Sequence, residues 1–167
     1  MLHVCPLSRL EETIVQSRAE KVVSLLAAGT AFSRPASILQ HNHLLLTMHD
    51  IVEAQLDMVP PGRDHVESLL AFARGWDRAR PVVVHCYAGI SRSTAAAYII
   101  AAALAPARDE LELAQALRAA SPSATPNPRL IAVADDLLGR RGRMVEAIAS
   151  IGRGADAFEG TPFALSI

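Results

Sequence analysis

The chain has 167 residues, of which 51% are apolar and 20% are charged, and its formal net charge is −1. This length and composition predict a folded domain with a substantial core, and the near-neutral charge argues against nucleic acid or an anionic membrane surface as a partner. The longest apolar stretch, residues 95–107, is too short to span a bilayer and contains Pro106. The N-terminus lacks a basic segment followed by an apolar run, and Cys5 and Cys86 do not make a disulfide framework. We therefore expect a cytoplasmic protein with free thiols.

Hydrophobic periodicity and turn residues predict alternating strands and helices. In chain order they are a strand over 2–7, a helix over 9–17, strands over 21–27 and 43–48, a helix over 63–79, a strand over 82–85, and helices over 92–104, 109–120, 127–138 and 143–151. Asp64, with Glu67 three residues later, resembles a capping box, and Asn127 followed by Pro128 is typical of a helix start. The tail after residue 151 gives no clear prediction.

This order of elements predicts an α/β fold, in which a central, mostly parallel sheet of four or five strands is flanked by helices. No linker or internal repeat divides the chain, so we expect one catalytic domain over residues 1–167. Ligands of such sheets bind at the carboxyl ends of the strands. The segment that follows the strand over 82–85 is therefore the expected binding edge.

Residues 82–94, VVVHCYAGISRST, combine a strand, a short loop and a helix start around one cysteine and one arginine. Five residues between Cys86 and Arg92 suit a loop that wraps once around a tetrahedral anion, with the loop amides and a helix N-terminus supplying positive potential. Arg92 would bind two oxygens of that anion. Ser93 would donate its hydroxyl to the sulfur of Cys86, and His85 would hold the loop by hydrogen bonds to the loop backbone.

The segment HCYAGISRST, residues 85–94, resembles the signature of cysteine-dependent protein tyrosine phosphatases, and the Ser-Arg-Ser ending is most similar to the dual-specificity branch. TMHDI upstream and SPSATPNPRLIAVADDLL downstream extend the resemblance over about residues 43–138. The resemblance implies that Cys86 is the nucleophile, that Arg92 and Ser93 assist it, and that Asn127 braces the loop. The expected phosphate-binding residues are Tyr87, Ala88, Gly89, Ile90, Ser91 and Arg92.

The general acid has three candidates. Asp50 directly follows the strand over 43–48 and matches the position that the resemblance gives to the acid, although 36 residues separate it from Cys86, slightly more than expected. Asp57 lies in an apparent loop, and Asp64 is better explained as a helix cap. We expect Asp50 to be the acid, with Asp57 as the alternative.

The expected activity is hydrolysis of a phosphomonoester through a phosphocysteine intermediate, without a metal or another cofactor. Phosphotyrosine in proteins, with or without phosphoserine and phosphothreonine, is the leading substrate; a small-molecule or inositol phosphate is the alternative. We expect phosphate or vanadate to bind the loop, and no nucleic acid or membrane partner. A silent phosphate-binding module and a thiol enzyme of redox or sulfur-transfer type stay open. So does a protective Cys5–Cys86 disulfide.

Overall fold

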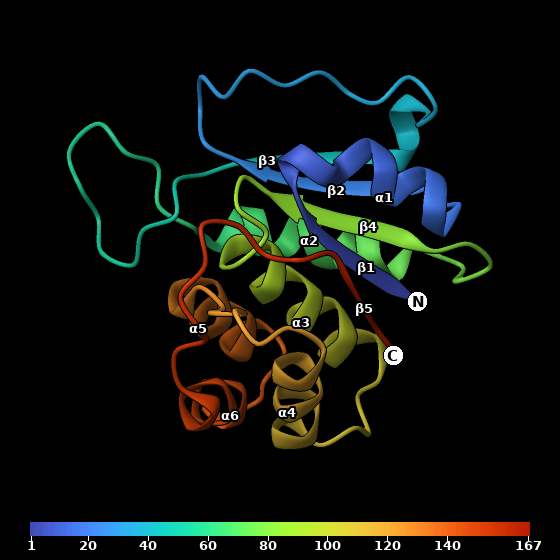
Figure 1. Cartoon of the computed structure of the whole chain (residues 1–167). Helices are drawn as coiled ribbons and strands as arrows, with labels where there is room; N and C mark the ends of the chain where they lie inside the picture. The colour runs from blue at the N-terminus through green and yellow to red at the C-terminus, as the bar shows by residue number, and fades with distance from the viewer.

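The computed structural model describes residues 1–167 and is built around one five-stranded sheet (Figure 1). The strand order is β3-β2-β4-β1-β5. The strands are β1 (Leu2–Pro6), β2 (Lys21–Leu26), β3 (His43–Thr47), β4 (Val82–Cys86) and β5 (Phe163–Leu165). The first four run parallel, and β5 pairs antiparallel with β1. The predicted fold class, a mostly parallel α/β sheet flanked by helices, is confirmed.

Helices cover both faces of the sheet. They are α1 (Leu10–Ser17), α2 (Arg63–Arg74), α3 (Arg92–Leu104), α4 (Glu110–Ala120), α5 (Pro128–Leu137) and α6 (Arg143–Ile151), with short 3-10 turns at Leu7–Arg9 and Gln40–Asn42. Figure 1 shows α1 on one face, α2 and α3 on the other, and α4, α5 and α6 beyond α3. None of these helices is both long and apolar enough to cross a membrane.

The core forms around β4 and α3, which carry the two ends of the predicted binding loop. All five residues of β4 are buried, as expected for a central strand covered on both faces. Helix α3 is buried from Arg92 to Ala102. Its alanine run lets the sheet and the outer helices approach closely from both sides, and a helix that is apolar all round belongs inside a protein. The loop between these two elements is therefore held at both ends by buried elements of the core.

Two local predictions were wrong, and both concern α2. The helix ends at Arg74 rather than Ala79, because Gly75 takes the capping position and Trp76 turns its indole N–H to the Arg80 carbonyl, 2.7 Å away. Asp64 is not the cap. Gly62 takes that position and donates its backbone N–H to His65 Nδ1 at 3.0 Å, while Glu67 pairs with Arg63 at 2.9 Å.

Candidate active site

The loop between β4 and α3, residues 87–91 and called the signature loop below, is held by its carbonyl groups. Four donors outside the loop bind four of these groups. The pairs are Leu7 N–H to the Tyr87 carbonyl at 3.0 Å, Gly160 to Ala88 at 2.8 Å, Thr125 to Ile90 at 2.9 Å and Asn127 to Ser91 at 3.4 Å. A trans peptide points its N–H opposite to its C=O. The amides of residues 88, 89, 91 and 92 therefore face the inside of the loop, where they form a concave group of donors.

Gly89 is the residue in this loop that no other amino acid could replace without movement. Its φ is +71°, in the left-handed region, and a Cβ built on it would lie 2.6 Å from the Pro6 nitrogen and 2.8 Å from the Cys5 carbonyl carbon. Both atoms belong to the backbone at the end of β1, which cannot step aside as a flexible side chain would. Gly89 thus lets the signature loop pack directly on the sheet.

Cys86 ends β4 at the bottom of the loop, and only 1% of its surface is exposed. Its sulfur lies 3.3 Å from the Gly89 N–H, which donates to it, and 3.1 Å from the Ser93 hydroxyl. These are two donors directed at one sulfur, next to the N-terminus of α3.

Arg92 begins α3 and is buried. One terminal nitrogen, Nη1, donates to the Met48 carbonyl at 2.9 Å, which ties the side chain to the end of β3. Nε is buried and has no hydrogen-bond partner in the protein; the Asp50 carboxylate lies 3.9 Å away. A buried cation with an unused donor is costly unless an anion accepts from it. The Arg92 guanidinium is thus suited to receive an oxyanion.

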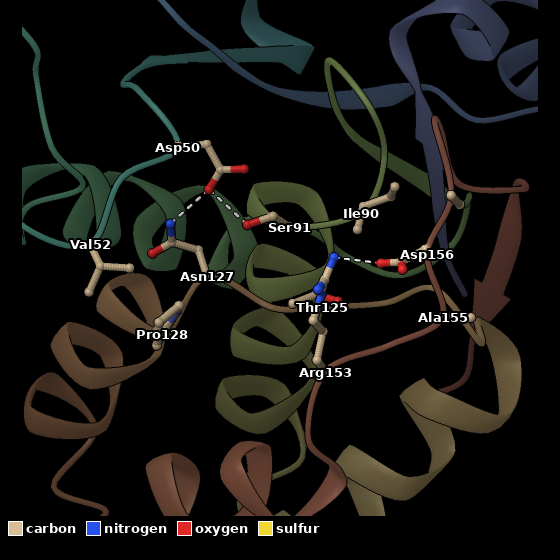
Figure 2. Close-up of a pocket in the computed structure, with 11 residues that line it drawn as sticks. Asp50, Val52, Ile90, Ser91, Thr125, Asn127, Pro128, Arg153, Ala155 and Asp156 are labelled. Carbon is tan, nitrogen blue, oxygen red and sulfur yellow. Dashed lines mark hydrogen bonds and ion pairs between the residues drawn. The ribbon is translucent and has the colours of Figure 1, made fainter.

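Asp50 lies three residues past β3 and reaches the signature loop from the neighbouring carboxyl end of the sheet. Its Oδ1 accepts from the Ser91 hydroxyl at 2.7 Å and from Asn127 Nδ2 at 2.8 Å (Figure 2). Oδ2 is the oxygen nearest Arg92. The Asn127 Oδ1 accepts from the amides of Arg129 and Leu130, so the same side chain also caps α5. One oxygen of Asp50 is therefore held by two donors, and the other faces Arg92.

The other two carboxylate candidates lie apart from this group. Asp57 sits in the exposed loop after Asp50 with φ +58°, and Asp64 lies in the exposed first turn of α2. His49 closes the base of that loop, since its backbone N–H donates to the Val59 carbonyl at 2.8 Å and its ring accepts from the Val59 N–H at 3.0 Å. The extra residues between Asp50 and Cys86 thus form a loop that is closed at its base by His49 and Val59.

His85 precedes the cysteine and points to the opposite face of the sheet. Its Nε2 meets the Ser24 hydroxyl at 2.6 Å, and Ser24 also meets His43 Nε2 at 2.9 Å. Burial lowers the pKa of His85 to about 4, although a contact with the Cys86 backbone acts in the other direction. His85 is therefore neutral at pH 7 and joins β4 to β2 beneath the loop.

Cys5 and Cys86 are both free thiols, and they leave the sheet on opposite faces. Cys5 pairs in register with His85 and packs in the smaller apolar cluster beside α1, whereas Cys86 belongs to the larger cluster around α3. Burial raises the pKa of Cys5 to about 12. Diverging side chains and a protonated Cys5 do not favour a disulfide between the two.

A cavity of about 320 Å³ opens beside the signature loop (Figure 2). Its lining residues come from four separate segments: Asp50 and Val52, Ile90 and Ser91, Thr125, Asn127 and Pro128, and Arg153, Ala155, Asp156 and Ala157. In Figure 2 the side chains of Asp50, Ser91 and Asn127 converge on one side, and Ile90 and Asp156 lie on the other. We call it the Asp50 cavity. No group of three or more His, Cys, Asp or Glu side chains that could hold a metal ion is found in the structure.

Sequence reasoning missed two parts of this arrangement. One is the Ser91 hydroxyl, which was expected to contribute only through its backbone and which instead contacts Asp50. The other is residues 152–162, called the C-terminal strap below, which bind the signature loop through Gly160 and line the cavity. Gly154 and Gly160 are the only local hint of close backbone packing there, since a Cβ at either would meet other backbone atoms within 3 Å.

No family model matches the sequence, and a search of curated proteins gives no match either. Solved structures do resemble it. The phosphatase PTP-2 of Cydia pomonella is 19% identical with a TM-score of 0.63, covering 81% of this chain and 84% of that one. DUSP15 is 17% identical with a TM-score of 0.62, covering 93% and 94% of the two chains. Human DUSP28 is 18% identical with a TM-score of 0.62, covering 84% and 89%.

The chain has the fold of the cysteine-dependent protein tyrosine phosphatases. The resemblance extends over most of both chains in each comparison. The expectation of a dual-specificity-like fold is confirmed. At identities below 20% the comparisons speak for the phosphatase fold. The roles of individual side chains depend on the geometry described above.

Replacing Gly89 by alanine should damage the site through its contact with β1. We expect Gly89→Ala to lower phosphate affinity at least about tenfold and to cost more than the roughly 1–3 kcal/mol of a strained backbone alone. Gly29→Ala is the matched control, because Gly29 has φ +80° and no atom lies within 4 Å of the position that its Cβ would take. Urea denaturation and phosphate binding measure the two effects. Equal losses in both variants would mean that the β1 contact is unimportant.

Stability should depend on His85 between pH 6.5 and 4. Its pKa falls from 6.5 to about 4 on folding, so the unfolded chain binds more protons in this range and acid favours unfolding. The contribution lost on acidification approaches about 3 kcal/mol. His85→Gln keeps an amide near Ser24 but does not titrate. Denaturation at pH 7 and pH 5 should show the natural protein losing about 2 kcal/mol more than the variant; parallel losses would contradict the assignment.

Proposed function

We propose that this protein hydrolyses phosphomonoesters through a phosphocysteine intermediate. The observation that carries the proposal is the pairing of two features at the ends of one short loop. The buried Cys86 sulfur accepts from the Gly89 N–H at 3.3 Å, and Arg92, at the other end of the loop, has a buried Nε donor without a partner. A phosphate dianion would accept hydrogen bonds from the inward amides of the signature loop and from Arg92. Ionised oxygens make the strongest hydrogen bonds, and here one of them would accept from Arg92 Nε, a buried donor that has no hydrogen-bond partner.

In the first step Cys86 attacks phosphorus in line, a sulfur–phosphorus bond forms, and the bond to the leaving oxygen breaks. That oxygen needs a proton, and Asp50 Oδ2 would supply it. Ser91 and Asn127 hold the other oxygen of Asp50, and Oδ2 is the oxygen that faces Arg92. In the second step water attacks the phosphocysteine, Asp50 takes a proton from the water, and Cys86 leaves as a thiolate that the Ser93 hydroxyl stabilises.

For the substrate we propose protein phosphotyrosine first, with phosphoserine and phosphothreonine as further possibilities. One structural neighbour, PTPMT1, is described in complex with PI(5)P. It is 14% identical to this chain, and the match covers 88% of this chain and 90% of PTPMT1. An inositol phosphate is therefore the alternative within the same mechanism. The chain's one lysine, Lys21, starts β2 at the far end of the sheet from the loop and donates to Asn42. The loop itself carries no lysine that would bind further phosphates.

The competing functions make different demands on Cys86. A silent phosphate-binding module would need no candidate acid, yet Asp50 is held within 3.9 Å of Arg92. A thiol enzyme of redox or sulfur-transfer type would need no buried arginine beside the cysteine. The proposed cycle needs Cys86 reduced, which agrees with a reducing compartment such as the cytoplasm.

Cys86→Ser should reduce turnover of an aryl phosphate by about four orders of magnitude or more, because a serine hydroxyl is not ionised at neutral pH. Arg92→Ala should lose binding of inorganic phosphate, which calorimetry measures directly. Cys5→Ala is the matched control, since Cys5 lies on the other face of the sheet, and it should retain full turnover. If activity survives in Cys86→Ser, or is lost in Cys5→Ala, the assignment of Cys86 as the nucleophile is wrong.

Asp50→Asn should reduce kcat most for substrates with poor leaving groups, since these need a proton most. We expect a loss of about 10²–10⁴ for a phenyl or alkyl phosphate and a small effect for a strongly activated aryl phosphate. Asp57→Asn, in the exposed loop, is the matched control and should behave like the natural protein. A leaving-group dependence that appears only in the Asp57 variant would move the acid there.

A further inference from the structure

The C-terminal strap is fastened at both ends. At its start, Arg118 of α4 donates to the carbonyls of Ile151 and Gly152 at 2.8 and 2.9 Å, and the Ala155 N–H donates to Pro122 at 2.8 Å. At its end, Gly160 binds the signature loop and β5 pairs with β1. Figure 1 shows this last part of the chain passing over the loop edge before it joins the sheet. The strap is therefore a fixed part of the binding edge.

Between its two hydrogen-bonded ends, the strap contributes exposed residues to the cavity that Asp50 also lines. Ala155, Asp156 and Ala157 line the Asp50 cavity opposite Val52 and Pro128 (Figure 2). If Asp50 protonates the leaving oxygen, as proposed above, the rest of the leaving group occupies the space that Asp50 borders. The strap then forms one wall of the leaving-group site.

We propose that this wall makes the site specific for an aryl leaving group, such as the side chain of phosphotyrosine, and that Ala157 and Phe158 determine the specificity. The inference rests on the proposed function. The cavity volume, about 320 Å³, is at the small end of ligand pockets and suits one ring rather than a large headgroup. Val52, Ile90, Pro128 and Ala157 give it apolar surface for the faces of such a ring.

Phe158 is placed to extend this wall. It follows Ala157, which lines the cavity, and stands two residues before Gly160, whose amide binds Ala88 of the loop. Two residues span at most about 7 Å, so the Phe158 backbone lies close to the loop rim. Its side chain is 94% exposed and packs against nothing in its own chain. An exposed aromatic beside a binding edge is typical of a residue that contacts a partner.

The charges at the rim agree with a substrate that carries one phosphate. Arg153 and Asp156 pair with each other at 2.5 Å across the strap, so neither offers a net charge to the cavity. Asp50 adds a second carboxylate to the lining. The one arginine in the lining, Arg153, is thus already paired, and the lining contains no lysine.

The test compares three variants on two substrates of different shape, a phosphotyrosyl peptide and the same peptide with phosphoserine. Ala157→Leu narrows the cavity and should lower kcat/KM for the phosphotyrosyl peptide about tenfold or more. Phe158→Ala should raise KM for that peptide about three- to tenfold with kcat unchanged. Neither variant should change kcat/KM for the phosphoserine peptide by more than about twofold. Ala107→Leu, an exposed alanine just past the far end of α3, is the matched control and should change neither substrate.

Inorganic phosphate separates this inference from the proposed function. Both variants should bind phosphate as the natural protein does, because the signature loop is untouched. If the natural protein neither binds phosphate nor hydrolyses either peptide, the proposed function fails. If it does both, and the Ala157 and Phe158 variants act alike on the two peptides or lose phosphate binding, the strap positions the loop and the specificity inference is overturned.

Discussion

The candidate site depends on one constraint, which is the outward fixing of the signature-loop carbonyls. A short loop of five peptides would ordinarily satisfy its carbonyls and amides with water in many orientations. Here Leu7, Gly160, Thr125 and Asn127 each donate to one carbonyl. Each rigid peptide plane then turns its amide inward, so an arrangement that binds anions is set before any anion arrives. Such preorganisation costs nothing at the moment of reaction, which is why fixed dipoles are effective in catalysis.

The rest of the fold can be understood as the means of bringing these four donors together. Leu7 follows β1, Thr125 and Asn127 precede α5, and Gly160 lies in the strap that leads to β5. These segments are far apart in the chain and meet only because α3 is buried between the sheet and the outer helices. Asn127 makes three of these contacts. Its backbone N–H donates to the Ser91 carbonyl, and its side chain both donates to Asp50 and caps α5.

How far the sequence predicts this structure depends on whether a signal is local. The strand over 82–85, the alanine-rich helix after Arg92 and the Asn-Pro start of α5 are each encoded within a few neighbouring residues, and all were placed correctly. The prediction that Asp64 caps α2 was wrong, because Gly62 is the N-cap residue and its backbone N–H donates to His65 Nδ1. Apart from Gly154 and Gly160, the strap and β5 have no local signal. Their positions follow from contacts with Ala88 and β1, which lie more than 70 residues away, and single-sequence patterns do not contain such contacts.

The same distinction between local and remote residues applies to the proposed function: the residues proposed for the chemistry are close together in the sequence, and those proposed for substrate specificity are not. Cys86, Arg92 and Ser93 come from one short segment, so the reactive group is assembled wherever that segment folds between a strand and a helix. The space around the leaving group is made by segments on both sides, with the loop after Asp50 facing the strap. Solved structures with the same fold are less than 20% identical to this chain, and a fold by itself does not determine a substrate. On the function proposed above, the substrate preference of this chain is therefore set by these two walls rather than by the signature loop.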